Sequence, residues 1–266
     1  MISRNARALP AAVVLALLAP HRSAEAQEAG SGLAGSSLIV GLGVAGGFAP
    51  TYEGSKRYEL LPAPAVSLSW NDTLLIENTT ARLAVVRTPW LQAGPLAAWR
   101  PGREEDDDRR LKGLGDVDDA VDLGAFARIG FGGWSASVSA RQDVISGGGA
   151  LVTFDTGYEL PLSDVLTLSV GADATWASDD YMSANFGVTR RQARRSRYRE
   201  FDAGAGFKTL GLSLGTAYAL SERWSLGAAA GWERLLGDAA DSPIVRQGGS
   251  PDQAYGFVSI SYRFGL

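Results

Sequence analysis

The chain has 266 residues, of which 45% are hydrophobic and 20% are charged, so it could form one large domain or two small ones. Its 33 glycines and 11 prolines favour strands and turns over long helices, because glycine weakens a helix interior by about 1 kcal/mol. The absence of cysteine excludes disulfides and a lipid-modified cysteine anchor, and the net charge of −4 argues against a nucleic-acid partner.

Residues 1–26 have the pattern of a secretory signal. Arg4 and Arg7 give a basic start, residues 9–19 an apolar stretch, and Ala24-Glu25-Ala26 a small-x-small cleavage site. The apolar stretch is too short for a membrane helix, which needs about 20 residues. We therefore expect an exported protein with a cleaved signal peptide at 1–26, a short segment at 27–36 and one domain at 37–266. Residues 1–26 hold three of the 25 basic and one of the 29 acidic residues, so the mature chain carries −6.

Alternation of apolar and polar side chains predicts strands along the rest of the chain. The clearest case is residues 166–176, where even positions are Leu, Val, Ala or Trp and odd positions are Thr, Ser, Gly or Asp. Expected strands lie near residues 37–48, 60–70, 90–100, 119–131, 134–145, 150–160, 165–177, 201–220, 223–236 and 253–264, with two short ones that turn near Asn78 within 73–87. The total is twelve, within a range of ten to fourteen.

A soluble β-sandwich would also give alternating strands, but its polar faces tend to be rich in Lys and Glu. Here the polar faces carry mainly Gly, Ser, Thr and Ala with scattered charges of both signs, which is typical of a barrel interior. These expected lumen-facing charges are Asp122, Arg128, Arg141, Asp143, Asp155, Glu159, Asp173, Glu233 and Arg263. Trp and Tyr fall near strand ends on the apolar faces, a depth that aromatic rings prefer at a membrane interface. The sequence therefore predicts an all-β fold, a transmembrane antiparallel β-barrel in the outer membrane.

Connection lengths predict the orientation of the barrel, because such barrels keep short turns in the periplasm and long loops outside. Short connections occur at Asn71-Asp72, at residues 161–164 and at Ser221-Glu222. Long connections occur at residues 49–59, 101–118, 178–199 and 237–252. The last strand must pair with the first, since an open edge in hydrocarbon would leave backbone groups unpaired.

Few residues offer catalytic chemistry. The only histidine is His21, in the expected signal peptide, so the mature chain lacks histidine and cysteine nucleophile pairs, histidine bases and ordinary zinc sites. We predict no catalytic, cofactor-binding or metal-binding residues. The acidic run at residues 104–110 is expected to be a solvated loop, with a divalent-cation site as the alternative.

An arginine cluster stands out in the long connection at 178–199. Its members are Arg190, Arg191, Arg194, Arg195, Arg197 and Arg199. On an external loop these guanidinium groups could bind phosphates of lipopolysaccharide; alternatively the loop could fold into the lumen and pair with carboxylates such as Asp155, Asp173, Asp202 or Glu233. The sequence leaves both interpretations open.

Several short motifs are spread over the chain in order. They are "PTYEGS" (50–55), "LPAPAV" (61–66), "QAGP" (92–95), "LKGLGDVDDAVDLGAF" (111–126), "YMSANFGV" (181–188) with Gln192-Ala193 and Ser196, "DAGAGFK" (202–208), "LGDAADSPIV" (236–245) and "YRF" (262–264). Together they resemble the MipA/OmpV family of outer-membrane proteins. The chain departs from the family pattern at Arg197, where Gly is usual after Ser196, and at Gly265-Leu266, which extend past Phe264.

The resemblance implies a non-enzymatic barrel in the Gram-negative outer membrane. It also implies a scaffold that interacts with a murein hydrolase, a lytic transglycosylase, and with a murein synthase, and it supplies no catalytic residues. The expected partners are thus outer-membrane lipid, lipopolysaccharide and murein enzymes, with no nucleic acid and no cofactor. Two alternatives remain: a narrow channel for small solutes, favoured by the polar lumen, and a surface adhesin or antigen, favoured by the long loops.

Overall fold

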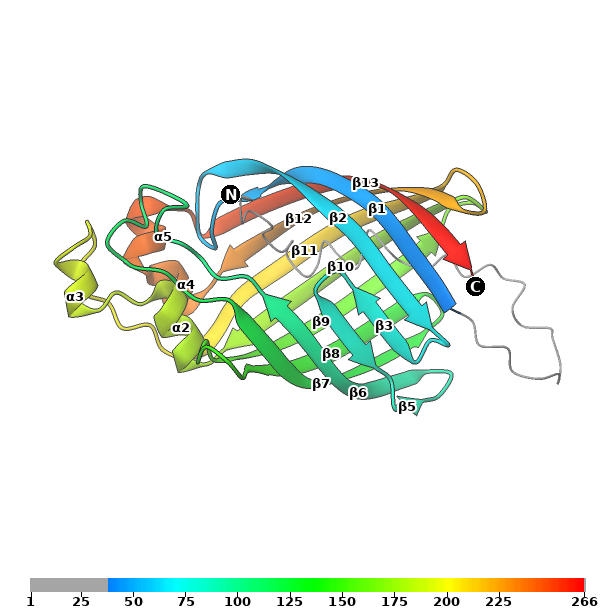
Figure 1. The fold of residues 1–266 in the computed structure, drawn as a ribbon, viewed down its shortest axis with the longest axis horizontal. Coiled ribbons are helices and arrows are strands. Elements are labelled where there is room, and N and C mark those ends of the chain that lie inside the picture. The colour runs from blue at the N-terminus through cyan, green and yellow to red at the C-terminus, as the bar shows by residue number, and fades with distance from the viewer. Residues whose placement is uncertain (1–37, 266) are drawn as a thin grey trace.

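The structure is a computed structural model that describes residues 38–265, so the expected signal peptide at 1–26 and segment at 27–36 lie outside the described residues. The described chain forms one antiparallel sheet that closes into a barrel (Figure 1). Its strands are β1 (Leu38–Pro50), β2 (Tyr58–Trp70), β3 (Leu74–Glu77), β4 (Thr80–Leu83), β5 (Val86–Arg87), β6 (Leu91–Arg100), β7 (Ala120–Phe131), β8 (Trp134–Asp143), β9 (Ala150–Pro161), β10 (Leu166–Ala177), β11 (Gly206–Ala219), β12 (Trp224–Leu235) and β13 (Asp252–Gly265). Its helices are α2 (Asp179–Phe186), α3 (Arg190–Ala193), α4 (Gly237–Asp241) and α5 (Pro243–Gly248).

The predicted barrel of twelve strands is confirmed. The first and last strands pair from Ile39↔Gly265 to Phe48↔Gly256, and β4 closes the other side of the sheet against β6 from Thr80↔Ala98 to Arg82↔Leu96. The two-residue strand β5 pairs only with β6 and adds nothing to the circumference. The short hairpin expected within residues 73–87 is β3 and β4, and its turn contains Asn78 with φ of 47°.

Each strand presents one face to the outside and one to the lumen, as its alternation predicts. On β10, for example, Val170 is an outer residue with 48% of its surface exposed, whereas Asp173 lies on the inner face directly opposite Asp155 of β9. Large exposed apolar side chains such as Leu212 continue the outer face on β11. An outer face of this kind fits a lipid environment, since a water-soluble protein rarely exposes so continuous an apolar surface.

The two ends of the barrel differ. Figure 1 shows the helices gathered at one end, whereas short turns join the strands at the other. Asn71 and Asp72 both have φ of 51°, and Gly132 and Gly133 have φ of 57° and 84°, as tight hairpin turns require. No helix within residues 38–265 is long and apolar enough to cross a membrane.

The strand predicted at 201–220 is shorter than expected, because β11 begins at Gly206. Carboxylates in the first turns of two helices bind the backbone ahead of it: Asp238 of α4 accepts a hydrogen bond from Gly204 N–H, and Asp179 of α2 accepts one from Ala205 N–H. Ala203 is buried in an apolar cluster with helix residues. These five residues therefore belong to the helical end and not to the wall.

Candidate functional site

The helix-bearing end forms a packed cap, which we define as residues 51–57, 101–119, 178–205 and 236–251. Helices α2, α4 and α5 contribute Phe186, Ala239 and Val245, respectively, to an apolar cluster that also includes Leu151 and Leu235 at the ends of β9 and β12. The hydroxyl of Ser242 donates to the carbonyl of Phe186 at 2.6 Å and so joins α5 to α2. The cap helices therefore share one apolar cluster with the ends of β9 and β12.

The acidic run at 104–110 is only partly the solvated loop that the sequence predicts, because Glu104 and Asp106 are exposed whereas Asp108 is not. Asp108 has a fully buried side chain and pairs with Arg57 at 3.3 Å and with Arg110 at 3.7 Å. Glu105 accepts hydrogen bonds from the N–H groups of Gly113 and Gly115 at 3.0 and 2.9 Å. Asp108 therefore joins the 101–119 loop to Arg57 of the first cap loop, whereas Glu105 holds its own loop together. Among residues 38–265 no cluster of three or more acidic, His or Cys side chains could hold a metal ion.

A charged cluster ties the cap to the wall directly beneath it. Lys208, on the inner side of β11, forms an ion pair with Glu53 of the cap, and the same carboxylate accepts the Tyr181 hydroxyl of α2 at 2.9 Å. The Tyr181 ring lies between two cations, with Arg100 at 5.1 Å and Lys208 at 5.5 Å from its centroid. Burial, and next the Glu53 carboxylate, raises the pKa of Tyr181 to about 12, so its hydroxyl remains a neutral donor.

A second set of charges lines the neighbouring wall. Arg100 binds Asp122 through two hydrogen bonds of 3.2 Å, and Arg141 lies 3.4 Å from the same carboxylate. Lower in the wall, Arg82 pairs with Glu77 at 2.8 Å on the inner face of the β3–β4 hairpin. Strands β4, β6, β7 and β8 therefore contribute most of the cationic groups of the lumen.

The facing wall is acidic. Asp155 and Asp173 are direct cross-strand neighbours on the inner faces of β9 and β10, and Asp155 accepts a hydrogen bond from Ser137 at 3.1 Å. Glu233 of β12 lies opposite Gly211 of β11, whose missing side chain leaves room for Asp173. The lumen thus has an arginine-rich wall, which also carries Asp122 and Asp143, and a carboxylate-rich wall, which also carries Lys208.

All nine charges expected in the lumen occupy inner positions of their strands, since the alternate positions carry the exposed apolar side chains. They are Asp122 and Arg128 on β7, Arg141 and Asp143 on β8, Asp155 and Glu159 on β9, Asp173 on β10, Glu233 on β12 and Arg263 on β13. Arg263 lies at the end of the barrel that carries the short turns, where it donates to the carbonyl of Glu222 at 2.8 Å.

Sequence reasoning missed Glu53, Arg100, Tyr181 and Lys208. A β-bulge opposite Thr175 places Lys208 and Thr209 together on the inner side of β11, so simple alternation misassigns this segment. The sequence does point to two of these residues, because Glu53 and Lys208 each lie inside a motif that carries the family resemblance. Nothing in the sequence joins these two motifs, which lie 155 residues apart.

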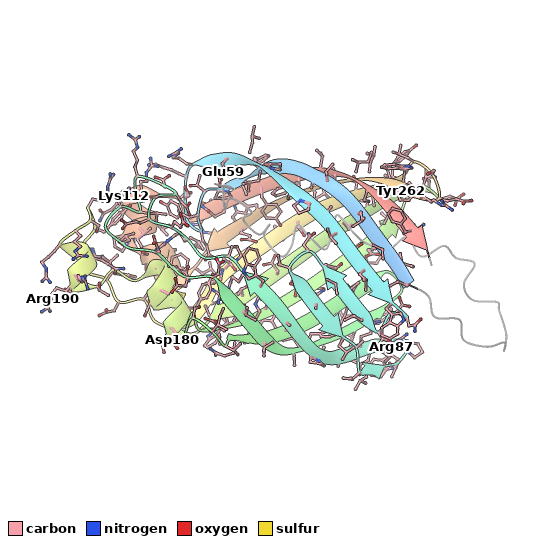
Figure 2. All side chains as sticks on the ribbon, in the orientation of Figure 1. Glu59, Arg87, Lys112, Asp180, Arg190 and Tyr262 are labelled. Atoms are coloured by element: carbon pink, nitrogen blue, oxygen red, sulfur yellow. The ribbon has the colours of Figure 1, made fainter. Side chains whose placement is uncertain are left out.

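The arginine cluster lies at the outer tip of the cap. Figure 2 shows Arg190 pointing away from the barrel, and this residue pairs with Glu200 at 3.4 Å. Within the described residues, no hydrogen bond or ion pair joins the cluster to Asp155, Asp173 or Glu233. This placement favours the interpretation in which the arginines lie on an external loop over the one in which the loop folds into the lumen.

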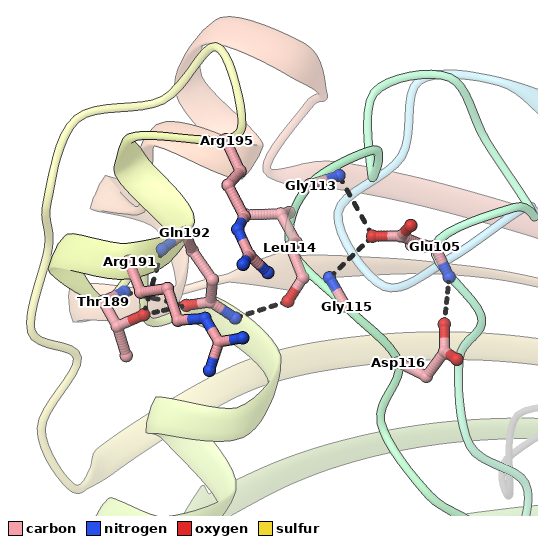
Figure 3. Close-up of a pocket in the computed structure, with 9 residues that line it drawn as sticks. All are labelled: Glu105, Gly113, Leu114, Gly115, Asp116, Thr189, Arg191, Gln192 and Arg195. Atoms are coloured by element: carbon pink, nitrogen blue, oxygen red, sulfur yellow. Dashed lines mark hydrogen bonds between the residues drawn. The ribbon is translucent and has the colours of Figure 1, made fainter.

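A pocket of about 500 Å³ opens beside the cluster (Figure 3). Arg191, Arg195 and Gln192 line one side, and Glu105 and the 113–116 loop line the other. Gln192 donates to the carbonyl of Leu114, and it also completes a capping box with Thr189 at the start of α3. The arginines therefore stand on a short segment that is anchored to the neighbouring loop.

Comparison with known proteins identifies relatives in the outer membrane. A family model described as MltA-interacting protein MipA matches residues 42–264. Outer membrane protein OmpV of Vibrio cholerae serotype O1 is 28% identical over 162 residues, and Outer membrane protein Omp26La of Vibrio anguillarum is 26% identical over 162 residues. In both cases the match covers 60% of this chain and 61% of the relative, which is less than two thirds of the relative's length.

Solved structures with similar folds are also barrels. The KdgM porin is 8% identical with a TM-score of 0.42, and the match covers 84% of this chain and 99% of the porin. The translocator domain of autotransporter NalP from Neisseria meningitidis is 13% identical with a TM-score of 0.43, covering 88% of this chain and 90% of that domain. Similarity at this level carries no information about function.

Proposed function

Because the chain belongs to the MipA family of outer-membrane proteins, we propose that it is a non-enzymatic scaffold or interaction protein for peptidoglycan-remodelling enzymes. The observation that supports this proposal is the family match itself, which spans both the wall and the cap and carries interaction with MltA in its description. A murein hydrolase and a murein synthase are the proposed partners.

A partner in the periplasm would meet only the short turns and the ends of the strands. One corner of that surface is well ordered by side chains. Arg223 donates to the Tyr262 hydroxyl at 3.1 Å, and Arg263 donates to the carbonyl of Glu222 at 2.8 Å, so the turn between β11 and β12 is fixed to the end of β13. We name residues 221–223 together with Tyr262 and Arg263 the periplasmic corner and propose it as part of the partner surface.

Two observations support a role without catalysis. The only histidine of the sequence is His21, outside the described residues, and the chain has no cysteine. The strongest charged clusters, around Lys208 and Asp122, bind cap and wall residues and so have a structural use. Their carboxylates and cations are paired mainly with one another.

The proposal is tested by capture of MltA on the protein reconstituted in nanodiscs. Replacing Arg223 and Arg263 by Ala should weaken capture, whereas Arg246→Ala on the cap, where Arg246 pairs with Asp241 at 2.8 Å, should not. If the wild-type protein captures neither MltA nor a murein synthase, the scaffold proposal is wrong.

A narrow channel is a second candidate, and the charged lumen specifically favours it. Arginines on β4, β6, β7 and β8 lie on one side of the lumen, and carboxylates on β9, β10 and β12 lie on the other. A small solute in the lumen would therefore experience an electrostatic field directed across the barrel. The cap lies over the outer end of this path, so a current would have to pass between its loops.

Binding of lipopolysaccharide is a further proposed property of the cap. Six arginines lie on or beside α3 at the surface-exposed tip, and guanidinium groups bind phosphates through paired hydrogen bonds. An adhesin role would use the same exposed surface.

A further inference from the structure

The outer half of β2 has no neighbour on one side. Its pairing with β3 runs only from Ser67↔Glu77 to Trp70↔Leu74, whereas its pairing with β1 extends from Leu38↔Trp70 to Pro50↔Tyr58. Figure 1 shows the β3–β4 hairpin ending well short of the outer end of β2. Within the described residues, the wall of the barrel is therefore interrupted beside residues 58–65.

On β2, prolines occupy positions whose backbone groups face this interruption. Asn78, in the hairpin turn, accepts from Val66 N–H at 3.0 Å and donates its own N–H to the Val66 carbonyl at 2.9 Å, so the backbone of Val66 faces the hairpin. Alternate residues of a strand present their backbone groups to the same side, so Leu60, Pro62 and Pro64 face the interruption. The two prolines have no N–H, so the donors left on this side are those of Leu60 and of Tyr58 at the outer end of the strand.

A separate break in the pairing of β6, on the other side of the hairpin, also coincides with a proline. Trp99 N–H donates to the Thr79 carbonyl at 2.9 Å, so the odd-numbered residues of β6 face the hairpin. Pro95 is one of them, and it falls between the segment of β6 that pairs with β4 and the segment that pairs with β5. Prolines thus stand where the wall has no partner for an N–H group.

The interruption lies at the depth of the outer leaflet. Tyr58 and Trp99 are exposed aromatic residues at the outer ends of β2 and β6, a position typical of the membrane interface. Leu60, with 84% of its surface exposed, follows toward the membrane centre. On the inner face the same stretch carries Glu59 at its outer end and then Leu61, Ala63 and Ala65, so below Glu59 this sector is apolar on both faces.

We propose that the gap between β2 and the β3–β4 hairpin is a lateral opening through which an acyl chain of an outer-leaflet lipid enters the lumen. An added strand from another protein is a poorer occupant, because prolines at alternate edge positions cannot donate to it. An acyl chain needs no N–H donor from this edge and matches the apolar side chains of Leu61, Ala63 and Ala65. This inference goes beyond the scaffold function and does not depend on it.

Brominated acyl chains provide a direct test, because bromine quenches a fluorophore that it touches. The chain has no cysteine, so a single Cys can carry a small fluorophore at Ala63, which lies on the inner face beside the gap. Ala229, on the inner face of β12 between paired strands, is the matched control, and Leu60 is the lipid-facing reference. In bilayers of brominated phosphatidylcholine, the Ala63 probe should lose fluorescence as the Leu60 probe does, and the Ala229 probe should not.

A second variant changes the opening itself. Asn78→Ala removes the side chain that holds the hairpin to Val66, so quenching at Ala63 should increase while that at Ala229 stays unchanged. An Ala63 probe as bright as the Ala229 probe in brominated lipid would overturn the proposal. A dimer cross-linked through Leu60→Cys would instead assign the edge to a second copy and would also overturn it.

Discussion

Lys208 of the barrel wall and Glu53 of the cap form an ion pair although 155 residues separate them in the chain. Lys208→Met should loosen the cap, because the Glu53 carboxylate beside Tyr181 would lose its ion-pair partner. We expect a loss of about 1–3 kcal/mol in cap stability, measured by hydrogen exchange in residues 179–186. Lys112→Met, which breaks an exposed pair with Asp106, is the control and should change little.

Charge placed on the two faces of β10 should have unequal costs. Val170→Arg puts a guanidinium group into lipid and should destabilise the barrel by about 2–4 kcal/mol, whereas Ser169→Arg points inward, opposite Glu159 and Gly215, and should cost much less. Equilibrium unfolding in bilayers measures both variants. Equal losses would contradict the assignment of faces.

Neutralising the acidic wall tests the channel candidate. If the barrel conducts, Asp173→Asn with Glu233→Gln should lower its preference for cations, because the arginines opposite would remain charged. Reversal potentials in planar bilayers under a salt gradient measure the change. Asp252→Asn removes a carboxylate paired with Arg234 on the outer face of the barrel, and it should leave the selectivity as it is. The absence of any current from the wild-type protein would exclude the channel.

Removing the outer arginines tests the proposed contact with lipopolysaccharide. A variant with Arg190, Arg191, Arg194 and Arg195 changed to Ser should retain less lipopolysaccharide during purification, while conductance stays unchanged because the cluster lies outside the lumen. Arg246→Ser, on another exposed part of the cap, is the control. Raised conductance with unchanged retention would contradict this placement and favour the lumen interpretation.

The cap should open at alkaline pH. Burial is the main cause that raises the pKa of both Tyr52 and Tyr181 to about 12, above the ordinary value of 10. Once the cap opens, these hydroxyls would ionise near pH 10, so the stabilisation is complete below pH 10 and is lost as pH rises toward 12. Absorbance of tyrosinate in detergent, compared between wild type and the double variant Tyr52→Phe/Tyr181→Phe, measures the effect. Two tyrosines ionising near pH 10 in the intact cap would refute it.

The wall could be predicted from the sequence because each of its strands meets lipid on one side and the lumen on the other. That contrast fixes the faces of β10, and the need for an even number of crossings locates the short hairpin at Asn78. Both arguments use only local patterns and connection lengths.

The cap could not be predicted in the same way, because its contacts join distant segments. Asp108 looks solvated within a run of charges, yet Arg57 and Arg110 balance it in a buried position. Lys208 breaks the alternation of β11 through a bulge, and its partner Glu53 comes from the first loop. Residue patterns carry little information about such pairs.

The seam between β1 and β13 has a consequence for the rate of folding. Its residue pairs, from Ile39↔Gly265 to Phe48↔Gly256, join strands from opposite ends of the described chain, whereas most other neighbours in the wall are consecutive hairpins. Closing so long a loop has a large entropic cost before any pairing repays it, so hairpins should form early and the seam last. Weakening the seam should therefore accelerate unfolding and leave the folding rate nearly unchanged, the behaviour of contacts that form after the transition state.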